Sequence, residues 1–293
     1  LTNNTVTGST EWPVELHDNS FPTYSGNSYS GNAISGIRIW GNITANGRWN
    51  REILPFYLSS LGVTIQATST VQVPARSIFK LNGDSTDIWC YGDLEMESTA
   101  AEPIYFTSWK DDEVGGDTDG TPGTTGTAGD WDSIAIANVA AEVHDCIFKY
   151  GGAYGGALYV TGVSPAVSGN TFISNVTGIE LDDSSSALTN NTVTGSTEWP
   201  VELHDNSFPA IGNNLFRDNA IEAIRLYGTV SASTTGRWNE VNGLPYYIDS
   251  GITINSGQMV TIGPGTIFKI LDDGAYMTVS GILNLLSEPG TPV

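Results

Sequence analysis

The chain has few basic residues, few cysteines and no long apolar run, and each shortage excludes a class of protein. Eleven Lys and Arg residues face 32 Asp and Glu residues, so the formal net charge over 293 residues is −21. A surface this acidic lacks the basic patches that neutralise phosphate, so we expect no nucleic acid among its partners. No apolar run reaches the roughly 18 residues that suggest a membrane-spanning helix, so we also expect no membrane span.

Cysteine and helix-forming residues are also scarce. Cys90 and Cys146 are too few for a disulfide framework, and we expect both to be buried small side chains. Runs of Ala, Leu, Glu and Lys are nearly absent, whereas Gly (34 residues) and the β-branched and turn residues are abundant. This composition predicts an all-β protein.

What the sequence does contain is a long internal repeat. Residues 1–22 recur without a change as residues 188–209, an offset of 187. The similarity continues with substitutions, as between Ile78-Phe79-Lys80 and Ile267-Phe268-Lys269. The chain therefore holds about one and a half copies of a unit of about 187–190 residues, and we expect it to begin and end inside a repeat.

A shorter period lies inside the long repeat. Apolar pairs such as Leu158/Val160 and Ile179/Leu181 recur about once every two dozen residues, and their alternation indicates strands with one buried face. We expect one position in each period to form an internal ladder, because a buried Asn amide can bond the amides above and below it. The ladder positions are Asn4, Asn27, Cys146, Asn170, Asn191 and Asn214. The last four are spaced by 24, 21 and 23 residues.

These spacings predict one continuous right-handed parallel β-helix over residues 1–293. A sandwich or a propeller would need hairpins about every 8–12 residues, whereas here the pattern recurs by whole coils of 21–24 residues. Parallel strands joined by crossovers wind right-handed for the usual chirality reason. At about 23 residues a coil, we expect roughly 12–13 coils, each about 4.8 Å from the next.

Three stretches resemble the right-handed β-helix repeat proteins of the pectate-lyase-like superfamily, as found in large surface proteins of bacteria and archaea. They are residues 247–269 with Gly263-Pro264-Gly265, residues 277–285, and residues 103–131 with Gly115-Gly116-Asp117. The resemblance covers nearly the whole chain. It implies an extracellular or cell-surface location and a stalk, an adhesive region or a carbohydrate-contacting surface, and it is weak for activity.

An acidic loop from Lys110 to Asp130 interrupts the coil rhythm. Asp117-Thr118-Asp119-Gly120 has the alternating carboxylates and the glycine turn that suit Ca²⁺, although no Glu follows at the last position of an EF-hand loop. The alternative is a solvated, mobile acidic loop. We expect calcium here, with a donor set of Asp111, Asp112, Asp117, Asp119 and Asp130.

Outward residues of the strands are the other candidates. Glu180 and Glu202 should lie on adjacent coils, where a carboxylate pair suits glycoside cleavage, but the basic partners of the pectinases do not accompany them. We therefore expect a solvated face and no catalytic residue. Four tryptophans repeat between the copies and either stack on sugars or plug the edge of the coils. They are Trp12, Trp49, Trp199 and Trp238.

We therefore predict a structural or adhesive segment of a secreted or surface tandem-repeat protein, or of an extracellular filament, stabilised by calcium and not an enzyme. Solenoid coils leave strand edges at both ends, so the expected partners are head-to-tail copies or further repeats of the same chain. Glycans are the other expected partner. The alternative is a polysaccharide-binding or polysaccharide-cleaving module, whose mark would be a groove with unlike carboxylates and basic partners.

Overall fold

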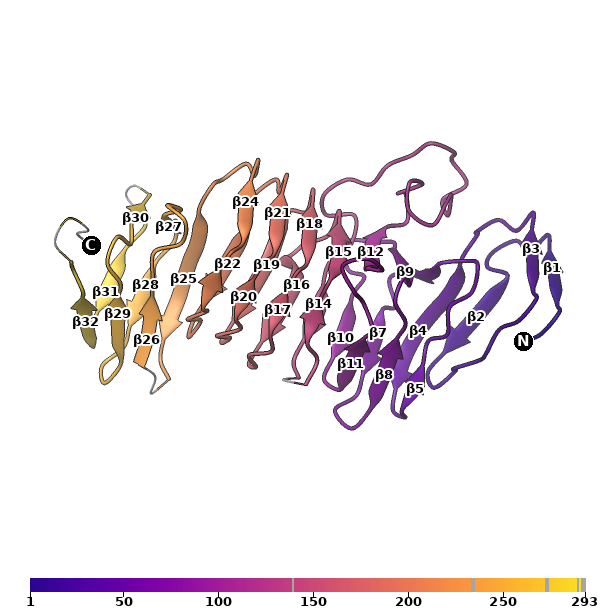
Figure 1. The fold of residues 1–293 in the computed structure, drawn as a ribbon, viewed down its shortest axis with the longest axis horizontal. Coiled ribbons are helices and arrows are strands. Elements are labelled where there is room, and N and C mark those ends of the chain that lie inside the picture. The colour runs from indigo at the N-terminus through magenta and orange to yellow at the C-terminus, as the bar shows by residue number, and fades with distance from the viewer. Residues whose placement is uncertain (139, 233–234, 272–273, 289, 291–293) are drawn as a thin grey trace.

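The structure is a computed structural model that describes residues 1–138, 140–232, 235–271, 274–288 and 290. Thirty-two strands wind into a parallel β-solenoid of about 12 turns, and the described residues contain no α-helix (Figure 1). Every pairing between two named strands is parallel. The predicted fold class and number of coils are confirmed. No helix in the described ranges has the length and hydrophobicity to cross a membrane.

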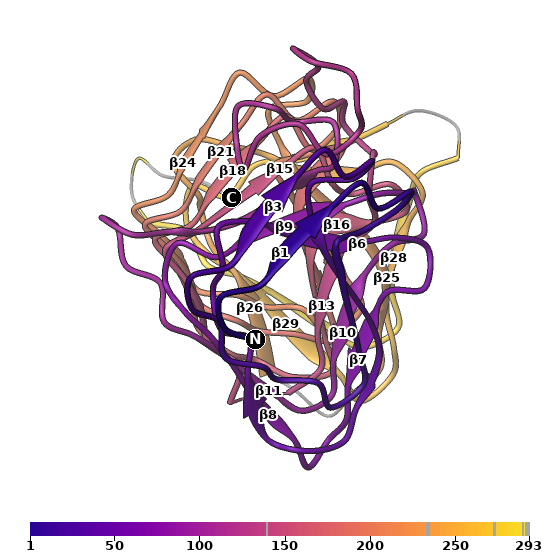
Figure 2. The same cartoon turned by 90° about the vertical axis from the view of Figure 1, so that its right-hand side faces the viewer.

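Each turn contributes one strand to each of three rows, which surround the core when the molecule is viewed along its axis (Figure 2). Row 1 contains β5 (Gly47–Arg48), β8 (Thr70–Val73), β11 (Asp93–Met96), β14 (Val143–His144), β17 (Val167–Ser168), β20 (Leu188–Thr189) and β23 (Ile211–Gly212). Row 2 contains β2 (Val14–His17), the first half of β4 (Ile37–Ile43), β6 (Phe56–Leu58), β9 (Ile78–Leu81), β12 (Ile104–Ser108), β15 (Cys146–Lys149), β18 (Thr171–Ile173), β21 (Thr192–Thr194) and β24 (Leu215–Arg217).

Row 3 is the face that carries the candidate site. It contains the second half of β4, β7 (Val63–Ile65), β10 (Ile88–Cys90), β13 (Ile134–Ile136), β16 (Gly156–Thr161), β19 (Thr177–Asp182), β22 (Val201–His204), the first half of β25 (Ile224–Val230), β27 (Tyr246–Ile248) and β30 (Phe268–Ile270). The last turns add β26 (Thr235–Trp238), β28 (Ile252–Ile254), β29 (Met259–Ile262), β31 (Met277–Val279) and β32 (Ile282–Leu285), and β1 (Thr5–Thr7) pairs with β3 (Ser28–Ser30) in the first turns.

The core repeats the same side chain from turn to turn. In row 2 the rings of successive phenylalanines lie 4.7–5.1 Å apart and nearly parallel. The stack runs through Phe56, Phe79, Phe106, Phe148 and Phe172. Because parallel strands repeat at about 4.8 Å, like residues placed in register meet face to face along the axis. The buried aliphatic residues of row 3 stack in the same way.

The asparagine positions also stack. The Asn170 amide nitrogen donates to Asn191 Oδ1 at 3.1 Å, and that of Asn191 donates to Asn214 Oδ1 at 3.0 Å; all three side chains are buried. Asn4 and Asn27 make the same contact at 3.1 Å in an exposed position. At Cys146 the backbone N–H still donates to Asn170 Oδ1, while the thiol turns inward to Met96 Sδ, 3.4 Å away.

The two identical segments do not lie in the same row. Strand β2 belongs to row 2, and seven steps along that row lead through β4, β6, β9, β12, β15 and β18 to β21. Its counterpart β22 follows β21 one row further on, in row 3. The repeat of 187 residues therefore spans seven turns and one row. Nothing in the sequence pattern predicted this change of face.

Candidate functional site

Four polar or aromatic side chains form a continuous outward line across row 3. Tyr159, Glu180, Glu202 and Arg225 are register partners on β16, β19, β22 and β25. The alternation of each strand sends their neighbours, such as Ile179 and Leu181, into the core. The expectation that Glu180 and Glu202 lie on adjacent coils of one face is confirmed.

Glu202 is a buried carboxylate with both oxygens engaged. Its side chain is 6% exposed; Oε1 accepts a hydrogen bond from Thr177 Oγ1 at 2.8 Å, and Oε2 pairs with Arg225 Nη1 at 3.0 Å. Arg225 is in turn held by Asp249, whose Oδ2 lies 3.0 Å from Nε. The guanidinium is thus shared between two carboxylates, and its contacts hold the Glu202 side chain in a fixed position.

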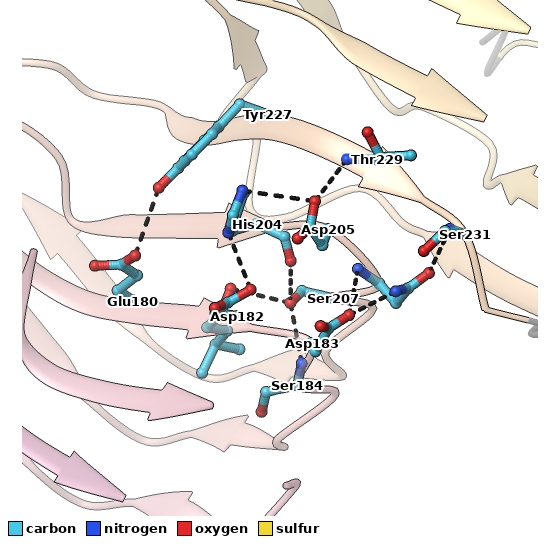
Figure 3. Close-up of polar contacts among 12 residues, drawn as sticks. Glu180, Asp182, Asp183, Ser184, His204, Asp205, Ser207, Tyr227, Thr229 and Ser231 are labelled. Atoms are coloured by element: carbon cyan, nitrogen blue, oxygen red, sulfur yellow. Dashed lines mark hydrogen bonds and ion pairs between the residues drawn. The ribbon is translucent and has the colours of Figure 1, made fainter. Parts of the chain in front are cut away.

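Glu180 is unlike its neighbour. Its Oε2 accepts the backbone N–H of Gly156 at 3.0 Å, and its Oε1 lies 3.5 Å from the Tyr227 hydroxyl (Figure 3). No Lys, Arg or His of the described residues forms an ion pair with it. Burial, and then repulsion from Glu202, raise the pKa of Glu180 to about 7, although the Gly156 N–H opposes this rise.

Two hollows of about 220 and 320 Å³ adjoin at Glu180. We call them together the Glu180 groove. Tyr154, Gly155 and Glu180 line both hollows. The first is completed by Trp89, Asp132, Ser133 and Tyr159, and the second by Gly152, Ala153, Val176, Thr177, Glu198, Glu202, Arg225 and Tyr227.

Tyr154 stands at the mouth of this groove. It is 74% exposed at the tip of the glycine-rich turn 151–156, and its hydroxyl donates to Asp84 Oδ2 at 3.2 Å. Gly155 lets the Glu180 carboxylate lie against the turn, because a Cβ there would meet that carboxylate and displace it. Sequence reasoning did not single out Tyr154. The symmetric motif Gly-Gly-Ala-Tyr-Gly-Gly was the available signal.

A second polar network lies beside the groove around His204 (Figure 3). His204 Nδ1 is 2.9 Å from Asp182 Oδ1, Nε2 is 3.5 Å from Asp205 Oδ1, and the ring stacks on Tyr227 with centroids 4.5 Å apart. Ligand atoms of the two aspartates and the histidine lie within 4.8 Å of one another. Tyr159 and the Thr229 N–H supply further hydrogen bonds to the aspartates, so the network is satisfied by the protein itself.

A smaller cluster on row 3 has a counterpart in the first copy. Arg225 lies over the Trp199 ring with Cζ 5.9 Å from its centroid and pairs with Glu202. In the first copy Arg38 lies 4.3 Å over Trp12 and pairs with Glu15 at 2.9 Å, on row 2. We call these the two Glu–Arg–Trp clusters. Because they belong to different rows, the two copies face different sides of the molecule.

The five loop aspartates separate into three groups. Asp112, Asp117 and Asp119 bring carboxylate oxygens within 4.8 Å of one another. Asp111 is fully buried and pairs with Lys149 Nζ at 2.8 Å. Asp130 pairs with Lys110 Nζ at 2.8 Å. The structure thus brings together three of the five expected calcium ligands and gives the other two to lysines.

Two buried lysines beneath the loop contact its acidic residues and backbone, and sequence reasoning did not single them out. Lys80 is fully buried, and its ammonium donates to the backbone oxygens of Asp111 and Gly116. Burial lowers the pKa of Lys80 to about 8. Lys80 on β9 and Lys149 on β15 lie on the outward side of row 2, where the loop covers them. The loop's apparent excess of negative charge is therefore partly neutralised from below.

The repeated tryptophans mostly pack rather than offer open rings. Trp49 and Trp238 are 2% and 1% exposed and contact core aromatic rings. Trp199 is 4% exposed beside Tyr247, and Trp12 is half-buried under Arg38. Of the two readings of these residues, the structure favours packing at the edge of the coils. The exposed rings near the site are Tyr154 and Tyr91.

Comparison with known proteins identifies the fold and leaves the activity open. Residues 127–267 match the family model described as a right-handed beta helix region. No curated protein and no solved structure matches the chain. Such folds occur in enzymes and in non-enzymes, so the match does not decide between them. The matched segment and the unbroken parallel stack that extends it on both sides show that this chain is a right-handed β-helix protein.

Proposed function

We propose that the chain is a structural segment of a rod-like secreted or cell-surface protein, in which turns stack head to tail with further repeats or with copies of the same chain. One observation carries this proposal. Apolar side chains that are solvent-exposed on the last turn correspond, in the first copy of the repeat, to side chains that are buried. Ile270, Val279 and Leu285 are 52%, 41% and 60% exposed. Their counterparts 189 positions earlier are Leu81, Cys90 and Met96, at 0%, 0% and 5%.

The cause of this difference is the turn that follows. In the first copy β12 and β13 pair with β9 and β10, and Phe106 stacks on Phe79 at 5.1 Å. On the last turn, no described strand follows β30, β31 or β32 in its row. A further turn of the same kind would bury the exposed half of each of these apolar side chains, with a gain of about 1 kcal/mol each, and would pair the open strand edges.

The opposite end is suited to the same contact. A hollow of about 650 Å³ opens there, lined mainly by apolar groups that include Leu1, Val6, Val14, Leu16 and Phe21. All strands run in the same sense within their rows, so one copy's last turn meets another's first turn as a parallel pair. The two ends therefore support continuation in one direction, which makes a rod rather than a closed dimer.

Sedimentation velocity and negative-stain electron microscopy test this proposal. We expect the protein to associate with rising concentration into rods that keep the width of one molecule. Val279→Lys with Leu285→Lys should abolish this association, and Leu61→Lys, which changes an equally exposed side chain away from the ends, should not. A wild-type protein that remains monomeric at high concentration would contradict the proposal, as would equal effects of the two kinds of variant.

We also propose that the acidic loop binds Ca²⁺ through three of its carboxylates, those of Asp112, Asp117 and Asp119. Their oxygens already accept backbone N–H groups of the loop, including Gly120 to Asp117 Oδ1 at 2.7 Å and Gly123 to Asp112 Oδ2 at 2.6 Å. A hard cation bound by these three carboxylates would hold the loop closed over β9 and β15.

The Glu180 groove favours ligand binding as a second function, and it argues against cleavage. Glu180, whose pKa is raised, and Glu202, which is paired with Arg225, are two carboxyl groups in unlike surroundings, as expected of an acid and base pair. However, Glu202 is 6% exposed and its two oxygens are engaged by Thr177 and Arg225, which disfavours attack on a sugar or activation of water. We propose binding without turnover. Sustained turnover of a glycan that is lost in Glu202→Gln would contradict this.

A further inference from the structure

Glu180 lies at the floor of an open groove, and no basic side chain in the described part of the chain forms an ion pair with its carboxyl group. Of the neighbouring acidic groups, Glu202 and Asp249 pair with Arg225 and Asp182 pairs with His204, whereas Asp132 and Glu198 in the walls are, like Glu180, outside the ion pairs of the described residues. Among the described residues, Glu180 accepts the Gly156 N–H and contacts the Tyr227 hydroxyl. An unpaired carboxylate in such a place is unfavourable, and a cation that entered the groove would remove that penalty.

The charged groups that face Glu180 come from each neighbouring strand. Glu202 on β22 and Asp182 on its own strand disfavour its ionised form, and His204 favours it. Asp132 and Glu198 add negative charge to the walls. Arg225 is the basic residue of the lining, and two carboxylates hold its guanidinium. The acidic side chains of the groove lining therefore outnumber its basic ones, and the net charge of the lining is negative.

The aromatic residues in the walls of the groove indicate which kind of cation it would bind. Tyr154 lines both hollows beside Glu180, Trp89 and Tyr159 line the first, and Tyr227 lines the second. Aromatic rings stabilise organic cations and pack against the apolar faces of alkyl chains and sugar rings. None of the described groups of potential metal ligands includes Glu180. The surroundings thus suit an organic cation with a body that covers aromatic surface.

We propose that the Glu180 groove binds a primary ammonium group, carried by an alkyl chain or an amino sugar, with the ammonium against the Glu180 carboxylate and the body of the ligand against Tyr154. The acidic lining disfavours uronates and other anions, and a neutral sugar brings no charge to compensate Glu180. This inference rests on the groove as a binding site and is independent of the stacking of rods.

Binding should be linked to the ionisation of Glu180. A bound ammonium favours the carboxylate, so complex formation releases a proton when Glu180 is protonated beforehand. The pKa of Glu180 is raised from 4.5 to about 7. If binding restores the ordinary value, the affinity rises with pH through this interval by at most about 300-fold, which is ten to the power of the 2.5-unit difference.

Titrations of the whole chain with n-pentylammonium, glucosamine, N-acetylglucosamine and galacturonate test the proposal, with the Gly156 amide as the NMR reporter beside Glu180. We expect n-pentylammonium or glucosamine to bind, and N-acetylglucosamine and galacturonate not to bind. Binding of both amines identifies the ammonium as the recognised group, whereas binding of glucosamine alone identifies an amino sugar. Equal binding of glucosamine and N-acetylglucosamine, or no binding by either amine, would overturn the proposal.

The affinities of variants and the pH dependence of binding distinguish a specific site at Glu180 from nonspecific attraction of cations to an acidic protein. Glu180→Gln keeps an acceptor for the Gly156 N–H and should weaken binding at least tenfold at pH 8, while Tyr154→Ala should weaken it less. Glu142→Gln removes the same charge from an exposed position and should leave binding unchanged.

With n-pentylammonium, affinity should fall between pH 8 and pH 5.5. Equal losses in the Glu180 and Glu142 variants, or affinity independent of pH, would contradict the assignment. The end variant Val279→Lys/Leu285→Lys keeps the groove, so its binding reports on the groove alone.

Discussion

Asn4 and Asn191 are the same residue of the repeated segment in two environments, and their replacement by alanine measures what the asparagine ladder contributes. The Asn191 side chain is buried and makes four hydrogen bonds, two accepted from Asn170 and two donated, to Val167 O and to Asn214 Oδ1. Asn191→Ala removes all four. At a net value of about 0.5–1.5 kcal/mol each, we expect a loss of about 2–6 kcal/mol.

The equivalent change in the first copy should have a much smaller effect. Asn4 is exposed and its amide makes two hydrogen bonds, to Thr2 O and Asn27 Oδ1, which water can replace. We therefore expect Asn4→Ala to reduce the free energy of unfolding by less than about 1 kcal/mol. The local sequence is the same in both places, so intrinsic propensity cancels and the difference reports burial and stacking.

Urea denaturation followed by circular dichroism measures both variants, and hydrogen exchange locates the loss. Solenoids can unfold in parts, so the Asn191 variant should lose protection first in the turns of β17, β20 and β23. Equal destabilisation by the two changes would refute the reasoning, as would a loss below about 1 kcal/mol for Asn191→Ala. An Asn191→Asp variant, which sets an acceptor oxygen against Val167 O and Asn214 Oδ1 in a buried place, should be at least as destabilised as Asn191→Ala.

Other parts of the structure lead to further expectations. Phe148→Ala should destabilise the protein by about 3–5 kcal/mol in the same urea assay, because it leaves a cavity within the aromatic stack. Lys149→Met, which leaves Asp111 buried without its ion pair, should cost about 3–5 kcal/mol and make the acidic loop sensitive to proteases. Calcium should raise the melting temperature of the wild type and not of Asp117→Asn; an unchanged melting temperature in chelator and in calcium would exclude the site. Since burial raises the pKa of Glu180 to about 7, its contribution to stability falls as pH rises from 4.5 to 7, by about 3 kcal/mol in all, and Glu180→Gln should remove this dependence in melting curves.

The sequence was sufficient for the fold because the fold repeats. A residue such as Ile179 or Leu181 is followed one turn later by its structural equivalent, so the spacing alone predicts both the strand and its neighbour. The same logic placed Glu180 beside Glu202. It also put Asn170, Asn191 and Asn214 in one line.

The site was less predictable because it depends on contacts that do not follow the period. Lys149 reaches Asp111 across a loop whose course no spacing specifies, so the loop appeared more negative than it is. Tyr154 belongs to a turn between strands, and its exposure depends on the path of the surrounding glycines. Sequence patterns predict which side chains stack, but they carry little information on which groups meet over the outer surface.

Because the two identical segments lie in different rows, successive repeats of a longer array would expose their Glu–Arg–Trp clusters on different faces. If further repeats keep the same length, each Glu–Arg–Trp cluster lies about 35 Å beyond the previous one along the axis, at seven and a third turns of about 4.8 Å. Each is also rotated by one face. Three repeats would then display the cluster in three directions before the first direction recurs. A fibre of this kind would carry the cluster on all three faces, so it could contact neighbouring molecules on every side along its length.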